Sequence, residues 1–361
     1  MEFFSSSVHE VLCAFFPELS LEERGDTCPP HYTIRNTAGG VNNFVKFVDI
    51  KLSDNAEETT YVLRIYNNGQ RESHVQFEHE VLRLLSACNF SFKIPTFIRP
   101  AGENEPNSSY IRLPSGDLAC ISTVINGRLP KAEFVTEIGR AAGELTSKLS
   151  RISPSMPCPI APIHDLYAVH SSIDREQFFS ILESMSDACE NDAVRDQIED
   201  ITRATFQIEI EIDILKEQQL PEQIIHGDLH YDNVLVDDNN KKVSGIVDFE
   251  FCSYDWRAME LAICLSKYLS EDSPLALIED FAAGYFSSLE TKFSEDEINA
   301  IPILIKLRII SNLVFFAGRQ ISGEDASGIF AAKIAPYMRR IAWLENNSIL
   351  LTEVVDKLSL K

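Results

Sequence analysis

Residues 224–251 carry the side chains with the clearest potential for chemistry. They contain the pattern H-x-D-x-x-x-x-N, with His226, Asp228 and Asn233 at the named positions, followed by an apolar run that ends in Asp248. Transfer of a phosphoryl group from a nucleotide to an alcohol needs one carboxylate that orients the acceptor hydroxyl and takes its proton. It also needs a second carboxylate and an amide oxygen that hold Mg²⁺ at the phosphates. Asp228, Asp248 and Asn233 supply these groups.

The spacing of these residues favours one compact site. An Asp five residues before an Asn places both side chains on one turn, and a neighbouring strand that ends in Asp248 can present its carboxylate across from them. The alternative is that Asp228 and Asp248 only cap turns, as Asp commonly does. His226 is different, because a histidine at this position is expected to anchor the loop by hydrogen bonds rather than to move protons.

Strands and one helix are predicted in the first third of the chain. Residues 31–66 alternate short β-forming runs with turn-rich pieces, and two further strand candidates follow before residue 127. Between them, residues 77–87 place apolar side chains on one helical face. After Gly127, apolar residues recur at intervals of three and four residues, so helices are expected to dominate the rest of the chain.

This pattern predicts an α+β fold with two lobes. The first, residues 1–122, is a small antiparallel sheet with one helix, and the second, residues 128–361, is larger and mainly helical, with a connection at 123–127. The alternating segment IEIEIDIL suggests a strand. However, apolar residues from Ile198 to Leu215 advance by three and four, which predicts one long helix.

The chain is strongly acidic, with 32 Lys and Arg against 55 Asp and Glu and a net charge of −23. Such a charge repels nucleic acid and anionic lipid, so neither is an expected partner. The most apolar run, residues 301–318, contains Lys306 and Arg308, which disfavour a membrane span and predict a buried helix. The start lacks a cationic leader and the eight cysteines include no C-x-x-C pair, so we predict reduced thiols and a cytoplasmic protein.

Two segments resemble a known family. HGDLHYDN and IVDFEF are similar to the catalytic segment of the aminoglycoside phosphotransferase and choline kinase superfamily, whose members share the protein-kinase-like fold and phosphorylate small alcohols. The run DFEFCSYDWRAMELAICLSKY most resembles the type II homoserine kinases of that superfamily. The resemblance covers residues from about 30 to 345. It implies a two-lobed protein-kinase-like fold that uses Mg²⁺ and ATP, with GTP not excluded.

By this resemblance, Asp228 is the catalytic base, and Asn233 and Asp248 bind Mg²⁺. The resemblance also implies nucleotide contacts in the first lobe: Gly39, Gly40, Arg64, Glu78, Ser122, Thr123 and Val124. Ser122 to Ile125 would form the interlobe hinge, whose backbone hydrogen-bonds the base of the nucleotide.

Each contact in the first lobe has an alternative. Gly39 and Gly40 would let backbone amides approach phosphate oxygens, but a Gly-Gly pair between strands is also a common hairpin turn. Arg64 stands where the family usually has a lysine that contacts the phosphates, and it could instead be an exposed strand residue. Glu78 is the preferred partner of Arg64, with Glu80 as the alternative, and either could be a solvated helix charge.

The acceptor site is expected beside Asp228. Four acidic residues gather in this part of the sequence: Asp232, Glu250, Asp255 and Glu260. Carboxylates in a partly desolvated pocket favour an acceptor with an ammonium group, although these acids could instead cap helix starts or pair with Arg257 or Lys267. His230 neighbours the base and could touch the acceptor, while Arg308 and Arg319 could bind a substrate carboxylate.

Together these features predict a nucleotide-dependent kinase of a small hydroxylated metabolite, such as the amino-acid alcohol homoserine. Aminoglycoside, choline and methylthioribose acceptors are alternatives within this class. A non-catalytic nucleotide-binding or regulatory protein is the alternative outside it, since Arg64 replaces the usual lysine. Motifs for Walker-type nucleotide loops, dinucleotide binding, zinc proteases and serine hydrolases do not occur, which leaves those classes without support.

Overall fold

The computed structural model describes residues 2–20, 31–37, 43–53, 56–66, 71–102, 108–188, 191–326 and 328–360. The chain divides into two compact units. Unit 1 comprises Met1–Ala87 and Lys93–Asn126, and unit 2 comprises Cys88–Phe92 and Gly127–Lys361. The chain leaves unit 1 after Asn126, within the segment 123–127 that the sequence predicts as the connection.

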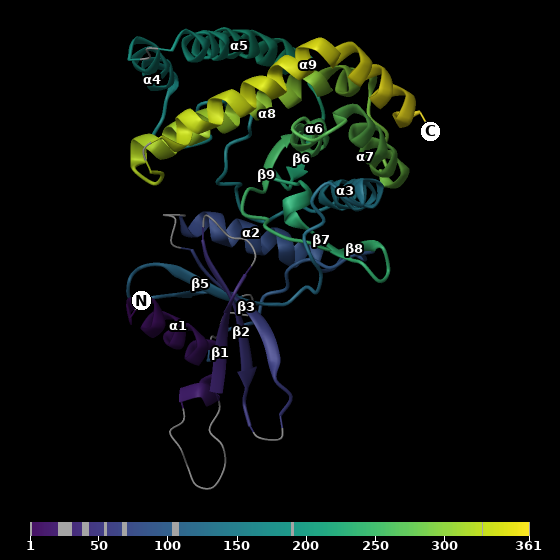
Figure 1. Cartoon of the computed structure of the whole chain (residues 1–361). Coiled ribbons are helices and arrows are strands. Elements are labelled where there is room, and N and C mark those ends of the chain that lie inside the picture. Colours follow the sequence, from purple (N-terminus) through teal and green to yellow (C-terminus); the bar gives the residue numbers. More distant parts are fainter. Residues whose placement is uncertain are drawn as a thin grey trace. The chain divides into compact units, whose positions relative to one another are not determined.

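Unit 1 contains one antiparallel sheet. Its strands are β1 (His31–Asn36), β2 (Phe44–Lys51), β3 (Thr59–Tyr66), β4 (Ile111–Arg112) and β5 (Leu118–Thr123). They lie in the order β1-β2-β3-β5-β4, and Figure 1 shows this sheet with its helices. All pairings are antiparallel. The small antiparallel sheet predicted from the sequence is therefore confirmed, and β5 joins it beside β3.

The two faces of this sheet pack against different helices. Leu63 and Ile65 of β3 join a core with α1 (Glu2–Phe15), which continues into the 3-10 helix η1 (Pro17–Ser20). Side chains alternate between the faces of a strand, so Tyr66 turns the other way and packs with Val75 of α2 (Glu72–Leu85). Arg64 lies on this second face as well, and its partner is therefore found on α2.

Unit 2 is mainly helical. Its helices are α3 (Val135–Leu149), α4 (Arg175–Asp187), α5 (Asp192–Glu217), α6 (Arg257–Tyr268), α7 (Pro274–Ser288), α8 (Glu295–Ser322) and α9 (Ile329–Ser359). Its strands, with the 3-10 helix η2 (Tyr231–Asn233), are β6 (Glu222–Ile225), β7 (Val234–Asp237), β8 (Lys242–Ile246) and β9 (Ser253–Trp256). β6 pairs with β9 and β7 pairs with β8, both antiparallel. The mixed α+β class predicted from the sequence is confirmed.

The segment IEIEIDIL lies within α5, as the longer-range spacing predicts. The residues that define the stripe, from Ile198 through Ile208 to Leu215, are all nearly inaccessible to solvent. The alternation within 208–215 instead leaves Ile210 and Ile214 exposed on the outer side of the helix. The conformation of this segment therefore follows the helical stripe, which has a period of 3.6 residues and is buried. It does not follow the local alternation of apolar and polar residues.

Helix α8 is a core helix of unit 2. Among the described residues it is the one helix long and apolar enough to cross a membrane by length and composition, and 67% of that apolar window is buried inside the structure. The two cations in its apolar stretch have partners, since Lys306 Nζ donates to Glu211 of α5 at 2.9 Å and Arg308 pairs with Asp228. The expectation of a buried helix is confirmed.

Residues 247–256 differ from the sequence prediction. The apolar run was expected to form a strand that ends in Asp248. Instead β8 ends at Ile246, Asp248 has a φ of 70°, and Ser253–Trp256 forms β9, paired with β6. A strand cannot continue through a left-handed residue, and the pairing of β9 depends on a partner about thirty residues away that local periodicity does not reveal.

Candidate active site

The β7–β8 hairpin brings Asn233 and Asp248 to the same end of unit 2. Asn233 is the last residue of η2, directly before β7, and Val234 pairs with Ile246 of β8. The amide of Val247 then donates to the carbonyl oxygen of Asn233 at 3.0 Å. Asp248 follows this contact by one residue, so the hairpin register places the two predicted metal ligands near each other.

The Asp228 carboxylate is held by three side chains. Asn233 Nδ2 donates to Asp228 Oδ2 at 3.1 Å and to its carbonyl oxygen at 2.8 Å. Arg308 Nη2 donates to Oδ1 at 2.6 Å, and His230 Nε2 lies 3.5 Å from the same oxygen. Burial alone would raise the pKa of Asp228, but His230 and Arg308 lower it to about 2. The carboxylate is therefore ionised at neutral pH, and its side chain remains 21% exposed.

His226 and Gly227 fix the start of the loop of residues 226–233, which we name the catalytic loop after its predicted role. The Asp228 amide donates to His226 Nδ1 at 3.3 Å, while His226 Nε2 donates to the Val247 carbonyl oxygen at 3.1 Å. Burial lowers the pKa of His226, so the ring is neutral and serves as the predicted anchor. Gly227 has a φ of 79°, and a Cβ there would lie 2.3 Å from the Phe251 carbonyl oxygen. Only glycine lets the two loops approach this closely.

Glu260 of α6 holds the same loop from within the helical core. Its fully buried carboxylate accepts hydrogen bonds from the amides of His226 and Gly227. Burial raises the pKa of Glu260 to about 8, although both amides favour the ionised form. The sequence suggested Glu260 as one of the acids around the acceptor, but the structure gives it the role of a loop anchor.

The groups at the hairpin end fit Mg²⁺. Because Asn233 directs its amide nitrogen to Asp228, its side-chain oxygen remains an acceptor, and Asp248 supplies a carboxylate at the same end of the hairpin. Magnesium takes such oxygens and completes its octahedron with water and phosphate oxygens, so two protein ligands suffice. In the part of the chain that the structure describes, no three His, Cys, Asp or Glu side chains cluster to hold a metal alone. The left-handed backbone of Asp248 is a strained conformation of the kind that functional sites retain.

The predicted acceptor residues separate into different environments. His230 lies beside Asp228, whereas Asp232 points outward, is 45% exposed and pairs with Lys267 at 2.5 Å. Glu250 is buried in the turn after Asp248. The charge of Asp232 is therefore already balanced by a cation of its own chain, which is the alternative that the sequence analysis left open.

Asp255 anchors a loop instead of facing the catalytic loop. It is 1% exposed, and its Oδ2 accepts the Ile163 amide at 2.7 Å. Its Oδ1 accepts the Trp256 amide at 2.7 Å and lies 3.1 Å from His164 Nδ1. These donors come from the end of the proline-rich segment and from the start of α6. The arrangement matches the helix-start alternative and differs from the predicted acceptor contact.

Of the two arginines considered for a substrate carboxylate, the structure brings only one to Asp228. Arg308 lies against the catalytic carboxylate, as described above. Arg319, about three turns further along α8, donates to Asp325 from Nε at 3.0 Å and from Nη2 at 2.7 Å. Its Nη1 also lies 3.2 Å from Glu324. Arg319 is thus occupied at the end of α8.

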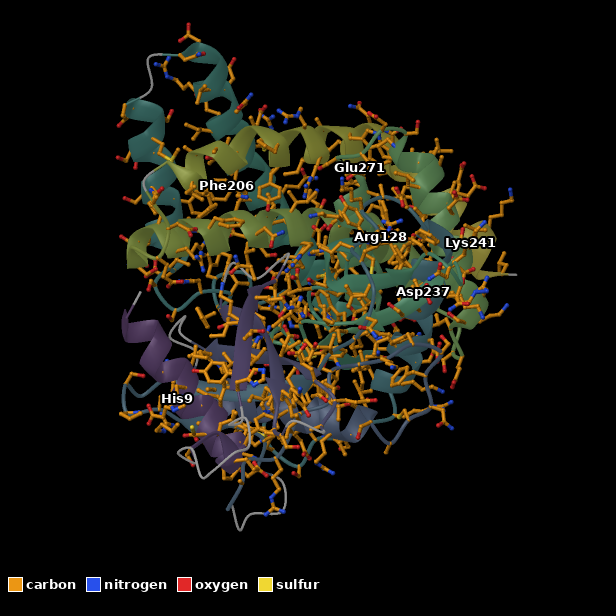
Figure 2. All side chains as sticks on the ribbon, turned by 60° about the horizontal axis from the view of Figure 1, so that its bottom comes forward. His9, Arg128, Phe206, Asp237, Lys241 and Glu271 are labelled. Atoms are coloured by element: carbon orange, nitrogen blue, oxygen red, sulfur yellow. The ribbon has the colours of Figure 1, made fainter. Side chains whose placement is uncertain are left out.

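A hydroxyl–carboxylate pair lies behind the catalytic loop. The Tyr231 hydroxyl donates to Glu271, which is labelled in Figure 2 and follows α6 in the chain. Burial raises the pKa of Tyr231 well above its ordinary value, and Glu271 adds to this effect, so the hydroxyl keeps its proton. This contact ties η2 to the end of α6.

In unit 1, Arg64 pairs with Glu78 on α2. Arg64 Nη1 donates to Glu78 Oε1 at 2.9 Å, and the Arg64 guanidinium carbon lies 5.3 Å from the centre of the Tyr66 ring. The second Glu78 oxygen accepts the Tyr66 hydroxyl at 3.1 Å. The alternative partner, Glu80, is bound to Arg83 on its own helix at 2.7 and 2.9 Å. The geometry therefore selects Glu78 as the partner.

His79 extends this network into the core of unit 1. Its Nε2 lies 3.0 Å from the Tyr66 hydroxyl, and its Nδ1 lies 2.7 Å from the Ser109 hydroxyl. Its ring stacks on Phe97, with centroids 3.6 Å apart. Burial, together with the Arg64 charge, lowers the pKa of His79 to about 3. No sequence pattern indicates this network, because its members come from separate strands, a helix and a loop.

The remaining nucleotide candidates are only partly described. Ser122 and Thr123 end β5, and Val124 follows it. The Thr123 amide already donates to the Thr96 carbonyl oxygen at 2.9 Å. Gly39 and Gly40 lie outside the described residues.

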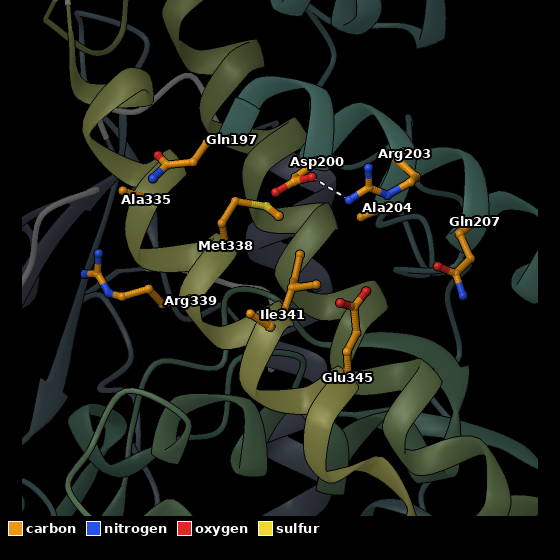
Figure 3. Close-up of a pocket in the computed structure, with 11 residues that line it drawn as sticks. Gln197, Asp200, Arg203, Ala204, Gln207, Ala335, Met338, Arg339, Ile341 and Glu345 are labelled. Carbon is orange, nitrogen blue, oxygen red and sulfur yellow. Dashed lines mark hydrogen bonds and ion pairs between the residues drawn. The ribbon is translucent and has the colours of Figure 1, made fainter. Parts of the chain in front are cut away.

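A separate groove lies between α5 and α9 of unit 2. Figure 3 shows Met338, Ile341 and Glu345 of α9 lining it, opposite Asp200 and Arg203 of α5, which form an ion pair. No residue of the catalytic loop lines this groove. Asp228, Asn233 and Asp248 are not among its lining residues, so the groove is separate from the candidate active site.

Comparisons with known proteins show which family the chain belongs to. A homoserine kinase of Zymomonas mobilis is 25% identical over 256 residues, which are 68% of this chain and 70% of that protein. The hydroxylysine kinase of Mus musculus is 27% identical over 278 residues, 71% of this chain and 69% of that protein. The solved structure of a microcompartment-associated aminopropanol kinase superposes with a TM-score of 0.63 at 14% identity, covering 96% of this chain and 98% of that one.

The fold and the loop built around Asp228 define a small-molecule kinase with a protein-kinase-like fold. The model of the phosphotransferase enzyme family matches residues 33–297, and the chain belongs to this family. The resemblance to the aminoglycoside phosphotransferase and choline kinase superfamily is thereby confirmed.

Proposed function

We propose that this small-molecule kinase uses Mg²⁺ and ATP, or GTP as the alternative donor, to phosphorylate an amino-acid alcohol such as homoserine. The observation that carries the proposal is Asp228, an ionised and partly enclosed carboxylate whose orientation Asn233 and Arg308 fix. Two relatives bear the names homoserine kinase and hydroxylysine kinase, and both names point to a hydroxylated amino acid.

The proposed reaction is a direct in-line transfer. The acceptor hydroxyl donates its hydrogen bond to Asp228, its oxygen attacks the terminal phosphorus, and the bond from that phosphorus to the bridging oxygen breaks. Asp228 takes the proton as the new bond forms. A carboxylate with a pKa of about 2 is a weak base, so its main task is to orient the hydroxyl until proton transfer occurs late in the step.

Asn233 and Asp248 would hold Mg²⁺, which supplies charge neutralisation at the phosphate oxygens. In unit 1, Arg64 would contact the phosphates, with its direction set by Glu78. Because the Thr123 amide is already bonded within the unit, we assign recognition of the base to the backbone that follows, at Val124 and Ile125. The covering role of Gly39 and Gly40 belongs to the same proposal.

An acceptor screen tests the function. ADP release would be measured with Mg-ATP and Mg-GTP for homoserine, hydroxylysine, aminopropanol, ethanolamine, choline, methylthioribose and an aminoglycoside. We expect turnover with a hydroxylated amino acid. Turnover with the sugars alone would refute the proposed acceptor class.

The role of Asp228 is tested by Asp228→Asn. This change keeps the shape of the side chain but removes the charge and the base, so we expect kcat to fall by roughly 10²- to 10⁴-fold with a folded protein. Asp238→Asn is the matched control, because Asp238 is an exposed carboxylate that pairs with Arg128 on the surface of the same unit. Unchanged turnover in Asp228→Asn would contradict the assignment.

One observation favours a second candidate, a protein that binds nucleotide but no longer transfers phosphate. Arg64 occupies the usual lysine position, and a guanidinium differs from an ammonium in reach and hydration. Thermal stabilisation by Mg-ATP without ADP release from any acceptor would support this candidate. We favour the kinase because the ion pair with Glu78 is formed and the trio in unit 2 is intact.

The proposal extends to the setting of the reaction. A net charge of −23 is unfavourable for contact with nucleic acid or anionic membranes, so we propose a cytoplasmic enzyme whose partner is a small acceptor with an ammonium group. His230 and Glu250 are the predicted acceptor contacts that we retain beside the catalytic loop.

A further inference from the structure

Arg308 is an unusual charge for its surroundings. It lies in an apolar stretch of α8, where the adjacent Leu307 and Ile309 are nearly inaccessible to solvent, and its own side chain is 16% exposed. A guanidinium in such a place is costly unless it is paired. The ion pair with Asp228 accounts for its charge, but not for the rest of its hydrogen-bonding capacity.

Most donors of Arg308 are left over by this ion pair. Arginine presents five N–H donors in a planar fork. Within the described residues, Arg308 donates one hydrogen bond, from Nη2 to Asp228 Oδ1, and its Nε and Nη1 groups find no partner there. A group bound to these donors would lie directly beside the carboxylate that orients the acceptor hydroxyl.

The environment of Arg308 favours an anion. Burial raises the pKa of Tyr337 of α9, while the charges of Arg340 and Arg308 oppose the rise, so both guanidiniums lie within electrostatic range of this hydroxyl. Arg340 donates to the Ser270 hydroxyl and forms no ion pair with a carboxylate in the described part of the chain. Glu271 lies within electrostatic range of Arg340 and offsets its charge, so the unused N–H donors of Arg308 are the feature that favours a carboxylate here.

Building on the proposed function, we propose that Arg308 binds the carboxylate of a hydroxylated amino acid acceptor along one edge of its fork. The second N–H of Nη2 and the neighbouring Nε or Nη1 hold the carboxylate, while the first N–H of Nη2 stays on Asp228. One guanidinium then connects the acceptor to the catalytic base. Bidentate binding of a carboxylate by arginine is strong and directional. Arg308 would thus select hydroxy amino acids over amino alcohols that lack a carboxylate.

The rival explanation is that Arg308 only balances the charge of Asp228. The two explanations differ in one quantity, the ratio of kcat/KM between an acceptor with a carboxylate and its analogue without one. Homoserine and 3-amino-1-propanol, which is homoserine without its carboxylate, form such a pair. Hydroxylysine and its decarboxylated analogue form another. If Arg308 only balances the charge of Asp228, replacing it lowers kcat/KM by the same factor for both acceptors. If Arg308 binds a carboxylate, replacing it lowers kcat/KM more for the amino acid than for its analogue.

The experiment measures this ratio in the wild type, Arg308→Gln and Arg308→Lys, with whichever pair contains the better acceptor. We expect the wild type to prefer the amino acid and Arg308→Gln to lower the ratio by roughly 100-fold. Arg308→Lys keeps the charge but not the fork, so its ratio should lie between them. Because both acceptors are assayed on the same preparation, partial misfolding of a variant cancels from the ratio.

Arg319→Gln is the matched control, since this arginine lies on the same helix but pairs with Asp325. Its ratio should equal that of the wild type. An equal ratio in the wild type and Arg308→Gln, or a wild type that prefers the acceptor without a carboxylate, overturns the inference and leaves the kinase intact. Absence of turnover with every acceptor instead refutes the proposed function, and the inference with it.

Discussion

At the scale of single residues, unit 1 holds the guanidinium of Arg64, the proposed phosphate contact, through one buried carboxylate. Glu78 divides its two oxygens between Arg64 and the Tyr66 hydroxyl, at 2.9 and 3.1 Å. Both partners are largely buried, so the geometry is more restrained than in an exposed ion pair. Tyr66 is therefore a positioning residue for Arg64.

Removal of this hydroxyl is expected to loosen the ion pair. In Tyr66→Phe the Glu78 oxygen loses a hydrogen bond worth about 1 kcal/mol, so we expect the KM for nucleotide to rise about 5-fold with an unchanged KM for the acceptor. The measurement is steady-state kinetics with each substrate varied.

Tyr110→Phe serves as the control for this prediction. Its hydroxyl also hydrogen-bonds a carboxylate on α2, Glu72, at 2.8 Å, but makes no contact with Arg64. A similar change in both variants, or a change only in melting temperature for Tyr66→Phe, would argue against a positioning role.

At the scale of elements, the candidate active site of unit 2 consists of two loops, the first of which is bound to helix α6. The loop after β6 carries Asp228 and the loop after β8 carries Asp248, and they touch where Gly227 meets the Phe251 backbone. Glu260 of α6 binds the amides of the first loop. The positions of the Asp228 and Asp248 carboxylates therefore depend on the contact between Gly227 and the Phe251 backbone.

Gly227→Ala tests this dependence. The added Cβ would lie 2.3 Å from the Phe251 carbonyl oxygen and would also occupy a left-handed backbone position, at a φ of 79°. Separation of the loops should lower kcat by roughly 100-fold, as expected for a misplacement of about 1 Å, and reduce the free energy of unfolding by more than about 2 kcal/mol.

Gly323→Ala is the matched control, because Gly323 has a φ of 75° but an added Cβ there would meet no atom within 4 Å. It should lose only the conformational term of about 1 kcal/mol and keep its turnover. Equal losses in the two variants, by urea unfolding and by rate, would mean that the close approach of the loops is unimportant.

At the scale of the whole molecule, the buried histidines couple stability to pH. His79 is almost inaccessible to solvent, and its pKa is lowered to about 3 from the ordinary value of 6.5. In the unfolded chain the same ring takes up a proton near pH 6.5. The unfolded state therefore binds more protons between these values, and stability falls as the pH drops from 6.5 towards 3.

The prediction is that His79→Gln flattens this dependence. Between pH 6 and 4, the wild type should lose about 1.4 kcal/mol per pH unit more than the variant, which carries no titrating group at this position. Urea unfolding at several pH values gives the two slopes. His31→Gln, at an exposed position of β1, should keep the slope of the wild type. Parallel slopes for His79→Gln and the wild type would show that His79 does not control acid stability.

The sequence by itself determined the long helix α5 and led to the prediction of a catalytic trio. The stripe from Ile198 to Leu215 specified α5, and the spacing of Asp228, Asn233 and Asp248 indicated their chemistry, because periodicity and loop motifs are properties of neighbouring residues. It also favoured Glu78, through its position relative to Arg64.

Only the tertiary structure decided which distant groups meet. Arg308 reaches Asp228 from 80 residues away, and Asp255 and Glu260, which looked like acceptor acids, instead anchor the proline-rich segment and the catalytic loop. These pairings depend on how α6 and α8 pack around the loop. A buried charge or amide needs a hydrogen-bond partner, and the packing determines which group lies close enough to be that partner. No local pattern encodes that choice, and it is therefore the fold that turns a recognisable motif into a particular site.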